Sequence, residues 1–424
     1  MMKPIKYPDK KDWNRILQRP ILDSFSLEET VSSILKNVKQ NGDLALKQYA
    51  LEFDKIELIS LKVSEQELNE AGNQISLALK KAIRAAKTNI ELFHASQKEE
   101  VKYIETIKGV TCWRKSVAIE KVGLYIPGGS APLFSTVLML GVPAQLAGCS
   151  EIILCSPCDM NGKINPAILY TAQLTGIKNI FKVGGAQAIG AMAYGTETIP
   201  SVYKIFGPGN QYVTCAKQLV NKNGVAIDMP AGPSEVAVLA DETCIPEFVA
   251  ADLLSQAEHG TDSQVILVSN SETVIVKVTG ELKKQLGLLP RKEIAMQALT
   301  NSKCILVKDL NEGITILNEY APEHLIIACR DEDKLAEKII NAGSVFLGNY
   351  SCESAGDYAS GTNHTLPTNG FAKAYSGVSL DSFVKKITFQ KIDKEGLRNL
   401  GNAIELMAEA EGLYAHKNAV SIRI

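Results

Sequence analysis

Residues 122–126 (VGLYI) form a short apolar run that ends at Pro127 and two glycines, and an apolar stretch from Phe134 to Gly141 follows. A short buried strand that leads through such a turn into a helix is the repeating unit of parallel sheets. The same arrangement recurs at residues 151–156 (EIILCS), 179–183 (NIFKV) and 201–206 (SVYKIF). These four runs predict one parallel α/β sheet.

A second series of apolar runs lies further along, at residues 264–269, 303–307, 325–329 and 344–348. Two helical blocks, from Ser26 and over 65–96, and a strand-like stretch over 101–113 precede both series. We therefore expect two Rossmann-like parallel-sheet domains without the usual dinucleotide fingerprint, a small N-terminal arm and a helical C-terminal tail. The expected boundaries are 1–22 for the arm, 23–120 with 240–378 for a discontinuous domain, 121–239 for the other domain, and 379–424 for the tail.

The composition restricts the classes of partner. The 424 residues contain 45 Lys and Arg against 47 Asp and Glu, a formal net charge of −2, so no overall positive field is available to hold nucleic acid. The apolar runs are too short to span a bilayer, and the first residues contain no apolar signal segment. Nine scattered cysteines are typical of reduced thiols. We expect a cytoplasmic protein with neither a nucleic-acid nor a membrane partner.

Histidine is scarce, with five residues in the chain, so each one is informative. In LLSQAEHG, Gln256 and His259 are spaced i, i+3 on a predicted helix and could converge on one metal ion. The plainer alternative is a polar helix C-terminus, where the helix dipole favours a histidine next to Gly260.

Glu323 and His324 lie between a helix that Pro322 stops and the strand that LIIAC begins. An adjacent carboxylate and imidazole on such a connection could carry out two different proton transfers. The alternative is an ordinary turn with a solvated glutamate. Asp357 and His364 lie in a segment without apolar periodicity, and a long loop of that kind in a compact domain favours a functional role. Glu411 and His416 straddle Gly412, and from position alone a solvated terminus is the simpler interpretation.

Three glycine-rich turns, in VGLYIPGGSAP, FKVGGAQAIG and FGPGNQYV, could bring the backbone close to a ligand phosphate. None of them is GxGxxG, and the acid expected some twenty residues downstream is missing. A nucleotide would therefore bind differently from the Rossmann fingerprint.

Eight segments together resemble the histidinol dehydrogenase family, in unbroken order from about residue 30 to the C-terminus. They are VGLYIPGGSAPLFSTVLM, VGGAQAIGAMAYGT, IFGPGNQYV, DMPAGPSEV, QAEHG, APEHL, GDYASGTNHTLPT and EGLYAHKNAV. The resemblance implies a homodimeric enzyme of L-histidine biosynthesis with sites shared between subunits. It further implies that the enzyme oxidises L-histidinol to L-histidinaldehyde and then to L-histidine, with NAD as acceptor and one zinc ion per site.

The resemblance also implies residue roles. Glu323 and His324 match the catalytic pair, and Gln256, His259, Asp357 and His416 match the zinc ligands. The substrate positions are matched by Ser234, Gln256, His259, His324, Asp357, His364, Glu411 and His416. The cofactor positions are matched by Tyr125, Gln187 and Asn210.

The residues themselves leave three other interpretations open. A zinc hydrolase would use the same His, Asp and Glu side chains without NAD. A thiol-based aldehyde oxidation would need Cys112 or Cys149 as nucleophile, although neither lies beside a histidine in the sequence. A non-catalytic protein stabilised by zinc would not depend on Glu323 and His324.

Overall fold

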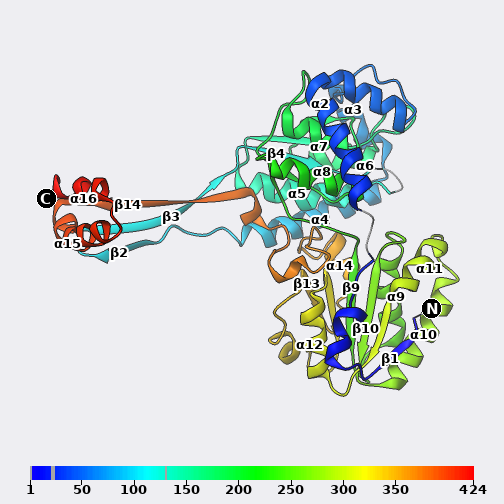
Figure 1. Cartoon of the computed structure of the whole chain (residues 1–424). Coiled ribbons are helices and arrows are strands. Elements are labelled where there is room, and N and C mark those ends of the chain that lie inside the picture. Colours follow the sequence, from blue (N-terminus) through cyan, green and yellow to red (C-terminus); the bar gives the residue numbers. More distant parts are fainter. Residues whose placement is uncertain (1, 21–23, 129–130) are drawn as a thin grey trace.

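The computed structural model describes residues 2–20, 24–128 and 131–424. Two α/β bodies lie next to each other, and a long arm projects from one of them to carry the C-terminus at its tip (Figure 1). Each body is built on one parallel sheet, so the predicted fold class is confirmed. Among the described helices, none combines the length and apolar character that a bilayer crossing needs.

The first sheet contains the four runs predicted from VGLYI onward. Its strands follow the order β6-β5-β4-β7-β8 and are all parallel, so the chain starts in the middle and then builds outward on both sides. The strands are β4 (Lys121–Tyr125), β5 (Glu151–Cys155), β6 (Asn179–Phe181), β7 (Lys204–Phe206) and β8 (Ala226–Ile227).

Helices cover both faces of the first sheet. One face packs against α2 (Ser24–Phe53), α7 (Gly185–Tyr194) and α8 (Gln211–Lys222). The other face packs against α3 (Glu65–Ala71), α5 (Phe134–Ala147) and α6 (Pro166–Leu174), and α4 (Leu77–Ala95) lies outside α5.

This packing corrects one expected boundary. We expected residues 23–120 to join residues 240–378, but α2 packs with α7 and α8 on the first sheet, and α4 packs on α5 of the same body. The cause is visible at Gly190 of α7, where a Cβ atom would lie 3.1 Å from Leu35 and 3.4 Å from Val38. The missing side chain lets the apolar stripe of α2 approach α7 closely, and that contact fixes the partner of the helix.

The second sheet also contains only parallel strands, in the order β1-β11-β10-β9-β12-β13. Its strands are β1 (Pro4–Lys6), β9 (Glu235–Ala240), β10 (Gln264–Ser269), β11 (Lys303–Leu306), β12 (His324–Ala328) and β13 (Ser344–Leu347). On one face lie α9 (Pro246–Ala257), α10 (Glu272–Leu286) and α11 (Lys292–Asn301), and on the other α1 (Trp13–Ile16), α12 (Leu310–Tyr320) and α13 (Glu332–Ala336). The N-terminal arm therefore supplies both an edge strand and part of a core.

The projecting arm is an antiparallel sheet in the order β14-β3-β2. It consists of β2 (Tyr103–Ile107), β3 (Val110–Ala118) and β14 (Val384–Ile392), with α15 (Lys394–Ala410) and α16 (Tyr414–Ser421) at the tip (Figure 1). The strand-like stretch over 101–113 is confirmed, but it pairs with the C-terminal segment rather than with residues 240–378. The reason is the nine-residue ladder of β3 with β14, which satisfies the backbone of both strands outside the two bodies.

Candidate active site

Glu323 and His324 lie at the amino end of β12. The helix α12 ends at Tyr320, Pro322 follows, and His324 is the first residue of the strand. Both residues are buried, at 7% and 3% residual exposure, so the solvated-turn alternative is wrong. The edge also differs from the usual one, since α/β sheets generally bind ligands at the carboxyl ends of their strands.

Backbone and side-chain donors hold Glu323 in place. Its Oε2 accepts a hydrogen bond from the backbone N–H of Glu235 at 2.8 Å and one from Gln256 Nε2 at 3.2 Å. His324 Nδ1 lies 3.2 Å from the carbonyl oxygen of Glu235 and 3.7 Å from Glu323 Oε2. The Glu235 carbonyl is the closer acceptor, since Asp357 Oδ1 lies 3.4 Å from Nε2, and the neutral form with its proton on Nδ1 leaves Nε2 as the basic nitrogen.

Burial and neighbouring charges shift the proton affinities of the pair. Burial raises the pKa of Glu323 to about 8, and His324 with the amide of Glu235 offsets only part of that effect. For His324 burial lowers the pKa, but the carboxylates of Glu323, Glu353 and Asp357 outweigh it and raise the pKa to about 10. Glu323 and His324 therefore both hold protons more tightly than they would in water. Groups with such shifted pKa values are typical of acid–base catalysis.

Asp357 lies on a short helix, α14 (Glu353–Tyr358), within the segment that the sequence presented as a loop. Its Oδ1 is 3.4 Å from His324 Nε2. Burial raises the pKa of the Asp357 carboxyl, but His324, His364 and His259 lower it overall. Asp357 is therefore an anion that faces three imidazoles.

His364 connects the two bodies. Its Nδ1 lies 3.0 Å from the carbonyl oxygen of Asp357, and its Nε2 lies 3.0 Å from Thr136 Oγ1. Thr136 is in the first turn of α5, the helix that follows the carboxyl end of β4. The amino edge of the second sheet thus meets the carboxyl edge of the first sheet at this histidine.

Gln256 and His259 lie at the end of α9, but not both on the helix. Gln256 is buried in the last turn, whereas His259 follows the helix in a turn whose N–H donates to the carbonyl of Gln256 at 3.2 Å. His259 is exposed to solvent at its surface. The protein around the imidazole ring still removes part of its hydration, and this desolvation lowers the pKa of His259. A neutral imidazole is the form that binds a metal ion.

The donor atoms fit a divalent metal ion of the zinc type. Among the described residues, Gln256 Oε1 and Asp357 Oδ1 are buried without a hydrogen-bond partner, and the nearest cationic atom to Asp357 Oδ1 in the ion pairs is His324 Nε2 at 3.4 Å. Such atoms are costly to leave unpaired, and coordination would satisfy them. Oxygen and imidazole donors without thiolate suit zinc or a similar dication.

Glu353 is a site residue that the sequence analysis missed. It is 1% exposed, and neither carboxylate oxygen has a hydrogen-bond partner in the described structure. One ligand atom each of Glu353, His324 and Asp357 lie within 4.8 Å of one another. Burial raises the pKa of Glu353 well above its usual value, and the pKa of nearby Asp252 is raised to about 6. The available signal was its position four residues before Asp357, one helical turn away.

Ser234 also lies at this edge, directly before β9, and its carbonyl accepts a hydrogen bond from the N–H of Gln264 at 3.1 Å. It therefore neighbours the residue whose amide holds Glu323. The structure thus gathers Ser234, Gln256, His259, Glu323, His324, Asp357 and His364 around one edge of the second sheet.

Glu411 and His416 are not part of this cluster within one chain. Glu411 directly follows α15 and His416 lies on α16, and both are exposed at the tip of the projecting arm (Figure 1). In a single subunit they form a solvated end, as the simpler interpretation had it.

Tyr125, Gln187 and Asn210 lie at the carboxyl edge of the first sheet. Tyr125 OH accepts a hydrogen bond from the N–H of Gly185 at 3.1 Å, and burial raises its pKa to about 12. Asn210 caps α8, with its Oδ1 accepting from the N–H groups of Tyr212 and Val213. A pocket of about 430 Å³ opens at this edge beside Gly128, Pro157 and Cys158.

The two cysteines considered as nucleophiles, Cys112 and Cys149, are poorly suited to that role. Burial raises the pKa of Cys149 to about 11, so its thiol stays protonated near neutral pH. Cys112 lies on β3 of the projecting arm. Neither observation supports a thiol mechanism.

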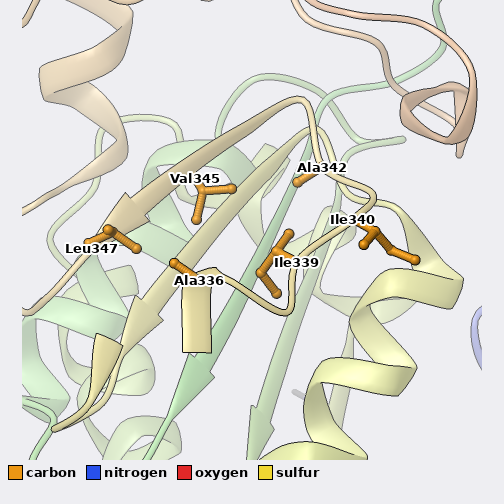
Figure 2. Close-up of a pocket in the computed structure, with 6 residues that line it drawn as sticks. All are labelled: Ala336, Ile339, Ile340, Ala342, Val345 and Leu347. Atoms are coloured by element: carbon orange, nitrogen blue, oxygen red, sulfur yellow. The ribbon is translucent and has the colours of Figure 1, made fainter. Parts of the chain in front are cut away.

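A second pocket has a different character. Figure 2 shows aliphatic side chains around it, beside β13 at the edge of the second sheet. The lining residues are Ala336, Ile339, Ile340, Ala342, Val345 and Leu347. No lining side chain of this pocket can transfer a proton or bind a metal.

Fold and site together define an α/β enzyme with a buried acid–base cluster and donors for a metal ion. The sequence profile described as histidinol dehydrogenase matches residues 17–424. The histidinol dehydrogenase of Bacteroides fragilis is 62% identical over 423 residues, covering 100% of this chain and 99% of that protein, and the one of Escherichia coli is 51% identical with 97% of both covered. A crystal structure of the Elizabethkingia anophelis enzyme of the same name superposes with a TM-score of 0.98 at 59% identity, covering 100% and 98% of the two chains. The chain belongs to the histidinol dehydrogenase family.

Proposed function

We propose that this protein oxidises L-histidinol to L-histidine through L-histidinaldehyde, in the cytoplasm, with two molecules of NAD reduced per substrate. The observation that carries the proposal is the buried Glu323–His324 pair beside two buried oxygens without a hydrogen-bond partner among the described residues, Gln256 Oε1 and Asp357 Oδ1. An alcohol-to-acid oxidation needs both a base for the hydroxyl proton and a base for the water that hydrates the aldehyde. Two adjacent groups with different surroundings can meet these two needs.

Gln256, His259, Asp357 and His416 would hold zinc, and Tyr125, Gln187 and Asn210 would contact NAD. Zinc held there would coordinate polar groups of the substrate, and NAD would supply the hydride acceptor. The protein's own groups then carry the protons. His324 would take the hydroxyl proton of the alcohol through Nε2 in its neutral form, which a zinc ion held by Asp357 would favour because the ion offsets the carboxylates that raise the pKa of His324.

Glu323 has the second task. Its Oε2 is engaged by the Glu235 amide and by Gln256 Nε2, which orients the carboxylate and leaves Oε1 to act on water. Burial keeps bulk solvent away from the aldehyde, so the attacking water has to be one that the site positions. Ser234, His364 and Glu411 complete the proposed substrate contacts.

The proposal includes a homodimer with shared sites. His416 and Glu411 lie at the tip of the arm, away from the cluster of their own chain (Figure 1). An arm that carries ligands outward can complete the site of a second copy. Each site would then combine Gln256, His259 and Asp357 of one subunit with His416 and Glu411 of the partner subunit.

The decisive experiment is the stoichiometry of NADH formed per L-histidinol consumed. We expect two NADH per substrate, loss of activity on thorough chelation, and recovery on adding zinc. One NADH with free aldehyde accumulating, or full activity without metal, would contradict the proposal. Hydrolysis of an amide or ester without any NADH would favour the zinc hydrolase alternative.

A further inference from the structure

Arg19, on the N-terminal arm, contacts two residues that adjoin the Glu323–His324 pair, Glu235 and Tyr320. Its Nη2 donates to Glu235 Oε2 at 2.9 Å and to the carbonyl of Tyr320 at 2.7 Å, while Nε binds Glu235 Oε1. The guanidinium carbon also lies 4.0 Å from the centre of the Tyr320 ring. The side chains of Arg19 and Glu235 keep only 17% and 2% exposure, so this is a two-pronged buried ion pair.

Glu235 connects this ion pair with the catalytic pair. Its backbone N–H binds Glu323 Oε2, and its carbonyl oxygen faces His324 Nδ1. The two ends of one residue's backbone therefore orient both proton carriers, while its side chain is held by Arg19. The backbone N–H of Asn369 adds a hydrogen bond to Glu235 Oε1 at 2.9 Å.

Arg19 also contacts the turn that leads from α12 to Glu323. Tyr320, whose carbonyl accepts from Arg19, ends α12, and Ala321 after it has a left-handed φ of 53°. That conformation is unfavourable for a residue with a Cβ, so surrounding contacts must hold it. The stacked Tyr320 ring is itself anchored, because its hydroxyl donates to Gln264 Oε1 at 2.9 Å.

We propose that Arg19 is a positioning residue for the acid–base pair, which fixes Glu323 and His324 through Glu235 and through the turn at Tyr320 and Ala321. The role of the N-terminal arm is then to lock the catalytic loop, in addition to adding an edge strand. This inference rests on the proposed function for the assignment of Glu323 and His324 as proton carriers. The contacts do not depend on metal or cofactor.

The planar guanidinium group of Arg19, which binds both carboxylate oxygens of Glu235, distinguishes arginine from lysine at this position. An ammonium group carries the same charge but cannot bind both carboxylate oxygens in one plane and stack on Tyr320. Arg19→Lys should therefore keep the charge and the fold but lose the positioning. A matched control is Lys6→Ala, since Lys6 lies on the same N-terminal arm but pairs at the surface with Glu272 of α10.

The test compares Arg19→Lys, Arg19→Ala and Lys6→Ala in the zinc-loaded enzyme. We expect both Arg19 variants to lose about 10- to 100-fold in kcat, with KM for L-histidinol and zinc content changed by less than about threefold. Guanidinium at millimolar concentration should partly rescue Arg19→Ala, and methylammonium should not. Unchanged kcat in Arg19→Lys, or an equal loss in Lys6→Ala, would overturn the inference.

Amide hydrogen exchange gives a readout without substrate. In Arg19→Lys the backbone amide of Glu235 and the segment 321–326 should exchange faster than in the wild type, and in Lys6→Ala they should not. Unchanged exchange in both segments would overturn the positioning role even if L-histidinol proved not to be the substrate. If wild-type protein failed to oxidise L-histidinol while exchange responded as expected, the proposed function alone would fall.

Discussion

Gln256 Nε2 donates a hydrogen bond to Glu323 Oε2 at 3.2 Å, so a proposed metal ligand and a proposed base share one contact. Glu323 Oε2 also accepts from the backbone N–H of Glu235, so this oxygen is an acceptor and the amide nitrogen of Gln256 faces it. The other end, Oε1, is buried and has no partner among the described residues. The amide therefore presents its oxygen to the position where a cation would neutralise the surrounding acids.

We predict that Gln256→Ala lowers zinc affinity at least about tenfold, since it removes an oxygen donor and also frees Glu323. Competition with a chromogenic chelator measures the affinity directly. Ser255→Ala is the matched control on the same helical turn, because Ser255 Oγ donates to the carbonyl of Asp252 and has no contact with Glu323. Equal zinc affinity in Gln256→Ala and the control would remove Gln256 from the ligand set.

The roles of Glu323 and His324 should become distinguishable when histidinol and histidinaldehyde are supplied separately. Glu323→Gln keeps the shape of the side chain but cannot accept a proton from water. It should therefore impair oxidation of histidinaldehyde at least as strongly as that of histidinol. His324→Ala should impair the alcohol step more, because Nε2 is the base for the hydroxyl proton.

Single-turnover NADH formation from each substrate measures the two steps. The control is zinc content, which should stay near one ion per site in both variants. Equal losses on both substrates for both variants would mean that the pair only shapes the pocket.

His94 should contribute to the pH dependence of stability. It is fully buried, its Nδ1 donates to the carbonyl of Ile90 at 2.9 Å, and burial lowers its pKa below 6.5. The unfolded chain therefore binds more protons than the folded chain once the pH falls below about 6.5. Stability is lost in that direction, by at most about 1.4 kcal/mol per pH unit from this one group.

Urea midpoints at pH 7 and pH 5 check this prediction. The His94→Gln variant cannot ionise, so its midpoint should fall less between the two pH values than that of the wild type, even if it is less stable at pH 7. A parallel fall in both proteins would show that His94 plays no part in the acid sensitivity.

The sequence predicted the two parallel sheets because a buried strand has a local signal, a run of five or six apolar residues next to glycine or proline. It also located Glu323 and His324, since Pro322 has to end the helix before them. It could not assign α2 and α4 to a sheet. An amphipathic stripe such as Leu35 and Val38 shows that a face is buried, and only the fold shows against what.

The missed features have a common physical cause. Glu353 looks like a surface acid in a polar segment, and its burial results from contacts with residues distant in the chain. The sequence assigned no role to Arg19 of the N-terminal arm, because its partners Glu235 and Tyr320 lie more than 200 residues away. Long-range ion pairs leave no periodic signal in a sequence.

The separation of His416 from the other proposed ligands leads to the last prediction. If each site takes His416 from the partner subunit, an Asp357→Ala homodimer and a His416→Ala homodimer are both inactive, because every site lacks one ligand. A mixed dimer collects both defects in one site and leaves the second site intact. Co-refolding the two variants should therefore recover up to about half of the wild-type activity per mixed dimer, provided that the two sites work independently. Differently tagged subunits allow the mixed dimers to be isolated and assayed. Mixed dimers without activity would show that the arm completes the site of its own subunit, since each chain would then carry one damaged site.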